Sequence, residues 1–243
     1  MRPLIGTGLK MNLTSSEAAI YFDELSQLVA PLSSCEIFVL PSFTSIWVAR
    51  DRLRGSNVYW GAQDVHPNEA GAHTGDISAA MLVDLGCSFV EVGHSERRRD
   101  HGETDEMVAL KVRQVLRHEM TPIICVGEHI RGRPEAALDH VLRQARTGMS
   151  LGSEADRRRV VIAYEPIWAI GEGAIAADPA HIGTVHRGLH ELATRVIYGG
   201  SVDPITAGPI LAQTGVDGLF VGRAALDPKQ FAAIAAIAAR TNS

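Results

Sequence analysis

The sequence predicts an α/β protein, a single (β/α)8 barrel domain over residues 1–243, and three observations predict this fold class. Eight short apolar, β-branched runs alternate with longer segments whose apolar residues follow helical spacing. Such alternation implies parallel strands joined by right-handed crossovers. Eight strand–helix units in 243 residues match the size of one barrel. An open doubly wound sheet is the alternative, but no GxGxxG motif follows the first run.

The strands are predicted from the apolar runs, and the helices from apolar periodicity and capping residues. A helix is expected over Ser15–Val29, with Ser15 and Glu17 as a start signal, and a last packing helix over 228–239. Asp-Pro pairs at 178–179, 203–204 and 227–228 each predict the start of a helix. The predicted strands are residues 4–10, 35–40, 57–63, 88–93, 121–126, 160–165, 195–198 and 215–221.

The composition is that of an ordinary globular protein. Hydrophobic residues make up 46% of the chain and the formal net charge is −5, which excludes disorder and argues against nucleic acid as a partner. The basic clusters 97–99 and 157–159 lack interleaved aromatic residues. No apolar run is long enough for a membrane span, and the start lacks an apolar signal core, so we expect a cytoplasmic protein. Cys35, Cys87 and Cys125 lie in apolar runs, which predicts reduced, buried thiols.

Three polar side chains follow predicted strands at the end where barrels carry their chemistry. Lys10 ends the first strand, where a positive charge could attract an anionic substrate; it could equally be the chain emerging into water. His94 follows the fourth strand and precedes a helix start, which favours a neutral imidazole able to donate to a carbonyl oxygen, although a structural histidine is the alternative. Glu165 follows the sixth strand as a candidate general base, and Trp168 and Ile170 give the next loop apolar surface for a lid.

Glycine-bearing turns close the last two predicted strands and suggest a phosphate site. Gly199-Gly200-Ser201 and Gly222-Arg223 let backbone N–H groups approach an anion, at the position where such barrels usually bind phosphate. We expect no metal site. His186 and His190 are spaced i, i+4, but no acidic general base lies between them and the segment is typical of an outer helix.

Six segments, in order along the whole chain, resemble the triosephosphate isomerase family. They are residues 6–12 (GTGLKMN), 61–63 (GAQ), 71–75 (GAHTG), 93–98 (GHSERR), 163–171 (AYEPIWAIG) and 198–202 (YGGSV). The resemblance implies an aldose–ketose isomerase that works through an enediolate and needs no metal or organic cofactor. Glu165 would be the carbon-acid base, His94 the neutral electrophile, and Lys10 the charge that stabilises the enediolate.

The same resemblance assigns supporting and binding roles. Ser95 and Glu96 would support the site from behind. Residues 166–176 would form a lid that keeps water from the enediolate. The loop around Thr74 would enter a partner subunit, which implies a homodimer and leaves a tetramer open. The substrate, a small phosphorylated sugar, would be held through its phosphate by Gly171, Ser201, Gly222 and Arg223.

The sequence departs from the family pattern at three places. Gly8 stands where the family usually has an Asn that contacts substrate, and loss of one preorganised donor typically costs ~10²–10³ in kcat. The lid reads GEGAIA instead of GTGKTA over residues 171–176, and Arg223 replaces a glycine. A wider pocket at Gly8 would admit a four-carbon ketose phosphate, as in the family's erythrulose-phosphate isomerases, which show similar departures. A non-catalytic sugar-phosphate-binding barrel is a further alternative, disfavoured because Lys10, His94 and Glu165 are all present.

Overall fold

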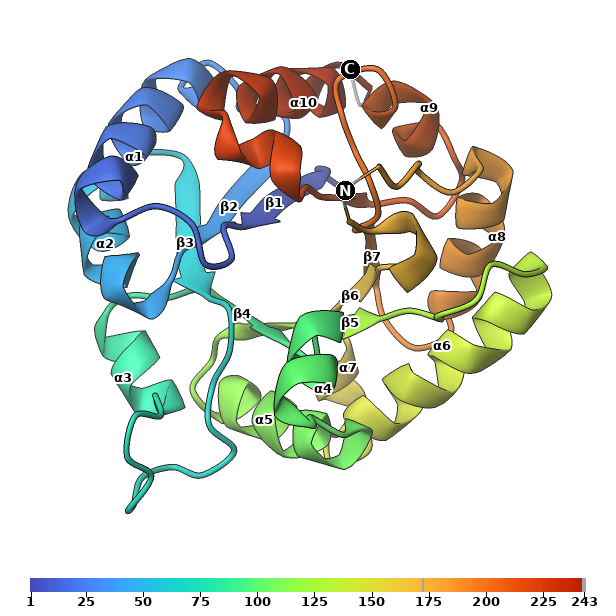
Figure 1. The fold of residues 1–243 in the computed structure, drawn as a ribbon, viewed down its shortest axis with the longest axis horizontal. Coiled ribbons are helices and arrows are strands. Elements are labelled where there is room, and N and C mark those ends of the chain that lie inside the picture. Colours follow the sequence, from blue (N-terminus) through green and yellow to red (C-terminus); the bar gives the residue numbers. More distant parts are fainter. Residues whose placement is uncertain (172, 242–243) are drawn as a thin grey trace.

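Eight parallel strands pair in chain order and close into a barrel when β8 pairs with β1 (Figure 1). The computed structural model describes residues 1–171 and 173–241, and of Arg157 the backbone alone. The helices form a ring outside the barrel, as Figure 1 shows down the barrel axis. The predicted (β/α)8 barrel is therefore confirmed.

All eight predicted runs form strands, and two of them match residue for residue. The strands are β1 (Leu4–Gly8), β2 (Glu36–Leu40), β3 (Val58–Ala62), β4 (Phe89–Val92), β5 (Thr121–Val126), β6 (Val161–Tyr164), β7 (Arg195–Tyr198) and β8 (Gly218–Phe220). The other predictions are one to three residues too long at an end. The first strand ends at Gly8 instead of Lys10, because Lys10 adopts a left-handed backbone with φ 54° that leaves the extended conformation.

The helices follow the predicted alternation. They are α1 (Ser15–Val29), α2 (Ile46–Leu53), α3 (Ala79–Asp84), α4 (Ser95–His101), α5 (Asp105–Arg117), α6 (Pro134–Gly148), α7 (Glu154–Arg157), α8 (Pro179–Leu189), α9 (Ala207–Leu211) and α10 (Pro228–Thr241). Short 3-10 turns cover Phe43–Ser45, Ile167–Ala169 and Arg223–Leu226.

The predicted helix Ser15–Val29 is confirmed as α1, but its cap differs from the expected one, and the helix predicted after Asp203-Pro204 starts later than expected. Thr14, one residue before Ser15, caps α1, because its side chain accepts from the Glu17 N–H while the Glu17 carboxylate accepts from the Thr14 N–H. After the Asp203-Pro204 pair the helix begins only at Ala207, because the Asp203 carboxylate first closes a turn by accepting from the N–H groups of residues 205 and 206.

Two apolar layers hold the barrel together. One fills its interior and includes Leu4, Phe38 and Phe89, with the Phe38 and Phe89 rings stacked at 4.8 Å between centroids. The other lies between the strands and the helices. Cys35, Cys87 and Cys125 are free and buried, as predicted.

His186 and His190 are packing residues of α8, as expected from the sequence. Both imidazoles face the carbonyl oxygen of Gly215, at 3.3 Å and 2.9 Å, and His190 also lies 3.3 Å from Asp217. Within residues 1–171 and 173–241, no helix has the length and hydropathy needed to span a membrane.

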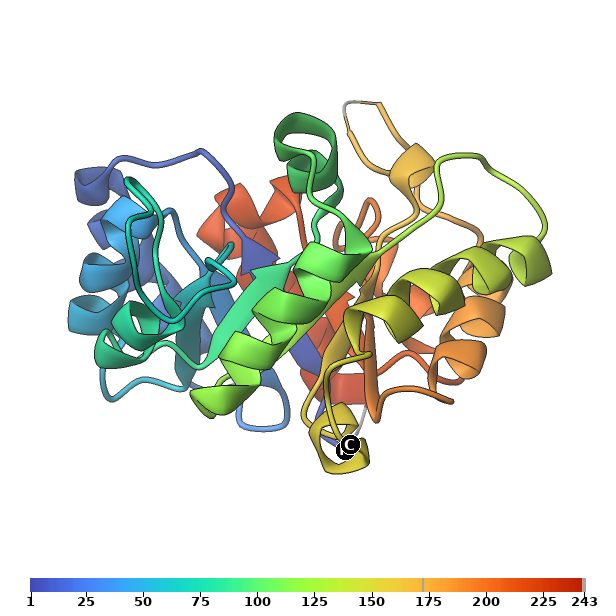
Figure 2. The ribbon, with the colours of Figure 1, turned by 90° about the horizontal axis from the view of Figure 1, so that it is seen from below.

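The segments that carry the predicted site lie at one end of the barrel. In Figure 2, α4 in green and the loop that follows β6 in orange stand at the same end, and the C-terminus lies at the opposite end. The parallel strands bring Lys10, His94 and Glu165 to this common rim, although they are far apart in the sequence.

Candidate active site

Glu165 lies at the mouth of the barrel, directly after β6. Its N–H donates to the Val126 carbonyl (2.8 Å), which continues the β5–β6 pairing by one residue and fixes the position of the side chain. The residue is only 4% exposed. Its side chain lies against Gly199, where an added Cβ would come within 2.5 Å of the Glu165 Cγ, so the close approach requires a glycine.

His94 caps the N-terminus of α4, and this role fixes its tautomer. The Nδ1 atom accepts from the backbone N–H of Glu96 (3.2 Å). In a neutral imidazole the proton therefore sits on Nε2, and this atom faces Glu165 Oε2 at 3.4 Å. His94 presents an N–H donor, not a lone pair, to the mouth of the barrel.

Lys10 completes the group from the end of β1. Its Nζ donates to Glu96 Oε1 at 2.7 Å, and its side chain keeps about a third of its surface exposed. The left-handed backbone of Lys10 is strained for a residue with a side chain. Its carbonyl accepts from Gln63 Nε2 (3.1 Å), which helps to hold the turn.

Burial controls the protonation of the two central groups. Burial, then the Lys10 charge, lowers the pKa of His94 to about 4, so the imidazole is neutral at physiological pH. Burial, then the Glu91 charge, raises the pKa of Glu165 well above its ordinary value, against the opposing effect of Lys10. A carboxylate base of raised basicity, a neutral N–H donor and an ammonium group can together remove a proton from carbon next to a carbonyl.

A buried ionic network holds the loop that carries His94. Glu103 accepts from the Gly93 N–H (3.0 Å) and from Arg97 Nε (3.2 Å), and lies 3.1 Å from Lys111 Nζ. Asp64 bridges Lys111 (2.6 Å) and Arg97 (2.8 Å). The sequence analysis missed Glu103, Asp64 and Lys111, because only the folded barrel brings them together.

The basic clusters have structural roles where they are described. Arg98 Nε donates to the Gly93 carbonyl (2.6 Å), and its guanidinium pairs with Asp105. Arg99 pairs with Asp100 at the surface. In the second cluster Arg158 and Arg159 are exposed, and the side chain of Arg157 lies outside the described part of the chain.

The structure gives no support for extra room at Gly8. A Cβ at Gly8 would lie 3.1 Å from Glu91 Oε2 and 3.7 Å from the Phe220 ring, so these two side chains take up space beside Gly8. Glu91 is a second buried carboxyl group at the barrel mouth that the sequence analysis did not single out. The signal was present: one charged residue stands in the middle of the apolar run Phe89–Val92.

The segment predicted to form a lid is held near both ends by hydrogen bonds. Trp168 Nε1 and the Tyr164 hydroxyl both donate to Glu128 Oε1 (2.6 Å and 3.1 Å). The N–H and hydroxyl of Ser201 both donate to the Ala169 carbonyl (3.0 Å and 2.9 Å). At the far end, the Ala177 N–H donates to the Tyr198 hydroxyl (2.9 Å). Glu172 of the predicted lid lies outside the described residues.

The predicted phosphate residues lie on three different segments. Gly171 has a left-handed backbone (φ 114°), and Gly222 precedes the 3-10 turn Arg223–Leu226. At both glycines the position that a Cβ would take is open space. Arg223 is exposed. The Ser201 N–H is already bonded to the lid segment. Ser95 is the first residue of α4.

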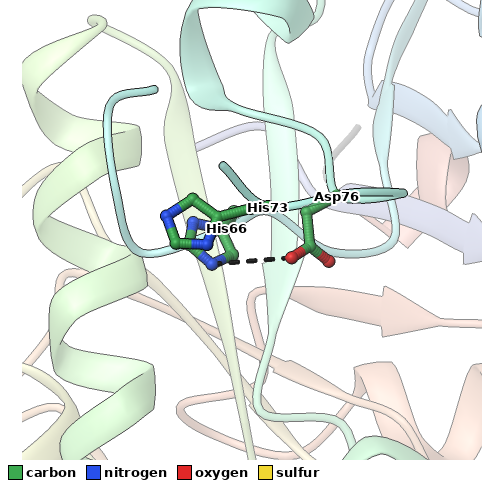
Figure 3. A group of neighbouring side chains, drawn as sticks. All are labelled: His66, His73 and Asp76. Atoms are coloured by element: carbon green, nitrogen blue, oxygen red, sulfur yellow. Dashed lines mark ion pairs between the residues drawn. The ribbon is translucent and has the colours of Figure 1, made fainter. Parts of the chain in front are cut away.

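A second cluster of possible metal ligands lies in the loop that carries Thr74. His66, His73 and Asp76 are neighbours there (Figure 3), and the two imidazole rings are 4.0 Å apart between centroids. His66 Nδ1 accepts from the Asn68 N–H (3.1 Å), so neutral His66 presents Nε2–H to Asp76 Oδ2 at 3.6 Å. This tautomer points an N–H, not a metal-binding lone pair, towards Asp76, and hydrogen bonds of Asn68 to His66 and His73 order the loop.

Comparisons with known proteins agree with this arrangement. The family model described as "Triosephosphate isomerase" matches residues 3–238. Curated proteins named triosephosphate isomerase are similar to the chain: that of Thermus thermophilus is 42% identical, covering 98% of this chain and 99% of its own, and that of Mycobacterium tuberculosis is 41% identical, covering 98% and 97%. A crystal structure of triosephosphate isomerase from Bartonella henselae superposes with a TM-score of 0.86 at 32% identity, covering 98% of this chain and 99% of that one.

The geometry predicts that His94 stays neutral well below the ordinary imidazole pKa. Nitrogen NMR of the labelled protein should show the neutral Nε2–H tautomer from neutral pH down towards pH 4. Because the pKa of the folded state is lowered, this residue's contribution to stability is complete above pH 6.5 and is lost as pH falls from 6.5 towards 4. A His94→Asn variant assigns the signal. An imidazole that gains a proton near pH 6.5 would contradict the assignment.

Proposed function

The chain belongs to the triosephosphate isomerase family, and from this premise we infer that it is an isomerase that interconverts dihydroxyacetone phosphate and glyceraldehyde 3-phosphate. The observation that carries the inference is the placement of Glu165, His94 and Lys10 at one rim of the barrel in a chain related to this family over nearly its whole length. A small phosphorylated sugar is the substrate class that the family acts on.

We propose that Glu165 removes the proton and that the other two groups stabilise the charge that follows. Glu165 takes a proton from the carbon next to the substrate carbonyl. His94 Nε2–H donates a hydrogen bond to the carbonyl oxygen, and Lys10 holds a positive charge near the enediolate. A proton also moves from the substrate's hydroxyl oxygen to the former carbonyl oxygen, relayed by His94 Nε2, and Glu165 then returns its own proton to the neighbouring carbon. The short Lys10–Glu96 contact keeps the ammonium group oriented.

We propose that residues 166–176 close over the substrate and exclude water. The bond from Ala177 to Tyr198 ties down the far end of the segment, while the bonds from Ser201 to Ala169 hold its near end in the conformation of this structure. Closure that breaks the bond from the Ser201 N–H to Ala169 would free this donor for phosphate. Gly171, Gly222 and Arg223 would supply further donors to the same phosphate.

The alternatives have less support. The four-carbon substrate depended on extra room at Gly8, and Glu91 lies in that room. A non-catalytic sensor needs the phosphate turns but has no use for a buried base facing a neutral imidazole. The relatives described above are named for the triose reaction.

A coupled assay with glyceraldehyde 3-phosphate and with erythrulose phosphate tests the proposal. We expect a kcat/KM of about 10⁷–10⁸ M⁻¹s⁻¹ on the triose and much slower turnover of the four-carbon sugar. Glu165→Gln should lower the triose rate by about 10²–10⁴-fold, because the variant lacks the base. Glu135→Gln, an exposed change on α6, is the matched control. Full activity of Glu165→Gln, or preference for the four-carbon sugar, would contradict the assignment.

We propose that the protein is a homodimer joined through the loop around Thr74. This loop projects from the ring of helices beyond α3, in teal in Figure 1, and Thr74 is exposed. Hydrogen bonds of Asn68 to His66 and His73 support the loop, as a docking segment requires. Analytical ultracentrifugation should give twice the mass of the chain, and Thr74→Arg should shift the equilibrium towards monomer. A Thr74→Arg variant that stays as dimeric as the parent protein would overturn the proposed contact.

A further inference from the structure

Glu91 points into the barrel, where apolar side chains are the rule. It occupies the third position of β4, two residues after Phe89, and alternate residues of a strand face the same side. Phe89 belongs to the apolar cluster inside the barrel. Glu91 is 5% exposed and pairs in register with Ile123 of β5. A carboxyl group therefore occupies the top of the barrel interior.

The partners of Glu91 differ from those of the other buried carboxylates near the site. Glu103 and Asp64 are neutralised by Arg97 and Lys111. Within residues 1–171 and 173–241, the side chain of Glu91 has one weak hydrogen bond, in which the Cys125 thiol donates to its Oε1 at 3.6 Å. Lys10 is the cation that most lowers the pKa of Glu91, but its ammonium group forms an ion pair with Glu96. Glu91 lacks the partner that a buried ionised carboxylate needs.

Glu91 also lies beside the proposed base. One side-chain atom each of Glu91, His94 and Glu165 lies within 4.8 Å of the others. The proton on His94 Nε2 argues against shared metal binding in this tautomer. Two carboxyl groups this close in a site of low dielectric do not both ionise readily, because the second negative charge is repelled by the first.

Burial raises the pKa of both carboxyl groups, Glu91 and Glu165. Burial raises the pKa of Glu91 to about 8, although the Lys10 charge and the Cys125 hydrogen bond oppose the shift. Neighbouring negative groups add to it. The groups that face Glu91 come from five segments of the barrel, two of them from the start of α4: Lys10, Asp64, His94, Glu96, Cys125 and Glu165.

We propose, on the basis of the isomerase function above, that Glu91 is a positioning residue whose neutral carboxyl group leaves the one negative charge of the pair on Glu165. Glu91 keeps its proton through the reaction, and no bond to it forms or breaks. When Glu91 ionises, its charge repels both the anionic substrate and the enediolate, and turnover falls. Gly8 belongs to this arrangement, because a side chain there would press on Glu91 Oε2.

The pH dependence of kcat/KM, compared between the parent protein and Glu91→Gln, tests this role. The parent protein should lose activity above about pH 8, by roughly tenfold per pH unit, as Glu91 ionises. Glu91→Gln places a neutral amide in the same space, so it should keep activity within a few-fold at pH 7 and lose the alkaline fall. A merely structural role would leave the alkaline fall in place.

Asp217→Asn is the matched control. Asp217 is also a partly buried carboxyl group whose pKa is raised by burial, but it lies by β7 and His190, away from the barrel mouth. This variant should keep the alkaline fall of the parent protein. The proposal is overturned if Glu91→Gln retains that fall, or if folded Glu91→Gln is inactive at every pH.

Infrared spectroscopy tests the protonation of Glu91 without any substrate. The parent protein should show a carboxylic-acid C=O band at pH 7 that is missing from Glu91→Gln and disappears as pH rises through about 8. Absence of this band would overturn the proposal whatever the activity. A protein that shows the band but turns over neither sugar phosphate would instead refute the proposed function, so the two failures are distinguishable.

Discussion

Burial of titratable groups at the mouth of the barrel is the constraint on which the rest of the site depends. Glu165, His94 and Glu91 are each under a tenth exposed, and low dielectric disfavours the charged form of each group. The imidazole is therefore neutral and able to donate a hydrogen bond from Nε2. The two carboxyl groups do not both ionise readily. The partly exposed ammonium group of Lys10 faces this set from the end of β1 and balances the remaining charge.

The buried charged residues near the site fall into a structural group and a group at the site itself. Asp64 and Glu103 are paired with Arg97 and Lys111, and this network holds the backbone on both sides of His94. Breaking such a buried network is strongly destabilising, since it leaves an uncompensated charge. In the part of the chain that the structure describes, no lysine or arginine forms an ion pair with Glu91 or Glu165, and burial raises the pKa of both carboxyl groups. Acidic residues therefore have two roles at this end of the barrel. Those paired with Arg97 and Lys111 stabilise the rim, and Glu91 and Glu165 set the charge of the site.

Much of the fold and the acid–base residues could be predicted from local pattern. Apolar runs located all eight strands, and strand ends placed Lys10, His94 and Glu165 on one rim because parallel strands share a direction. Contacts between side chains of different strands could not be predicted. The absence of a side chain at Gly8 predicted free space there. Glu91 takes up space beside Gly8, but it comes from β4 and becomes a neighbour only when the barrel closes. The Asp64–Lys111 pair was missed for the same reason.

The central claim is that Glu165 moves a proton between neighbouring carbons through an enediolate, and isotope exchange tests it most directly. Dihydroxyacetone phosphate incubated with the protein in heavy water should gain one deuterium, at one of the two prochiral positions of its hydroxymethyl carbon. Glu165→Gln should abolish this incorporation, because solvent exchanges with substrate through the carboxyl group. Deuterium uptake catalysed by Glu165→Gln at the rate of the parent protein would contradict the account, because the exchange would then not pass through this carboxyl group.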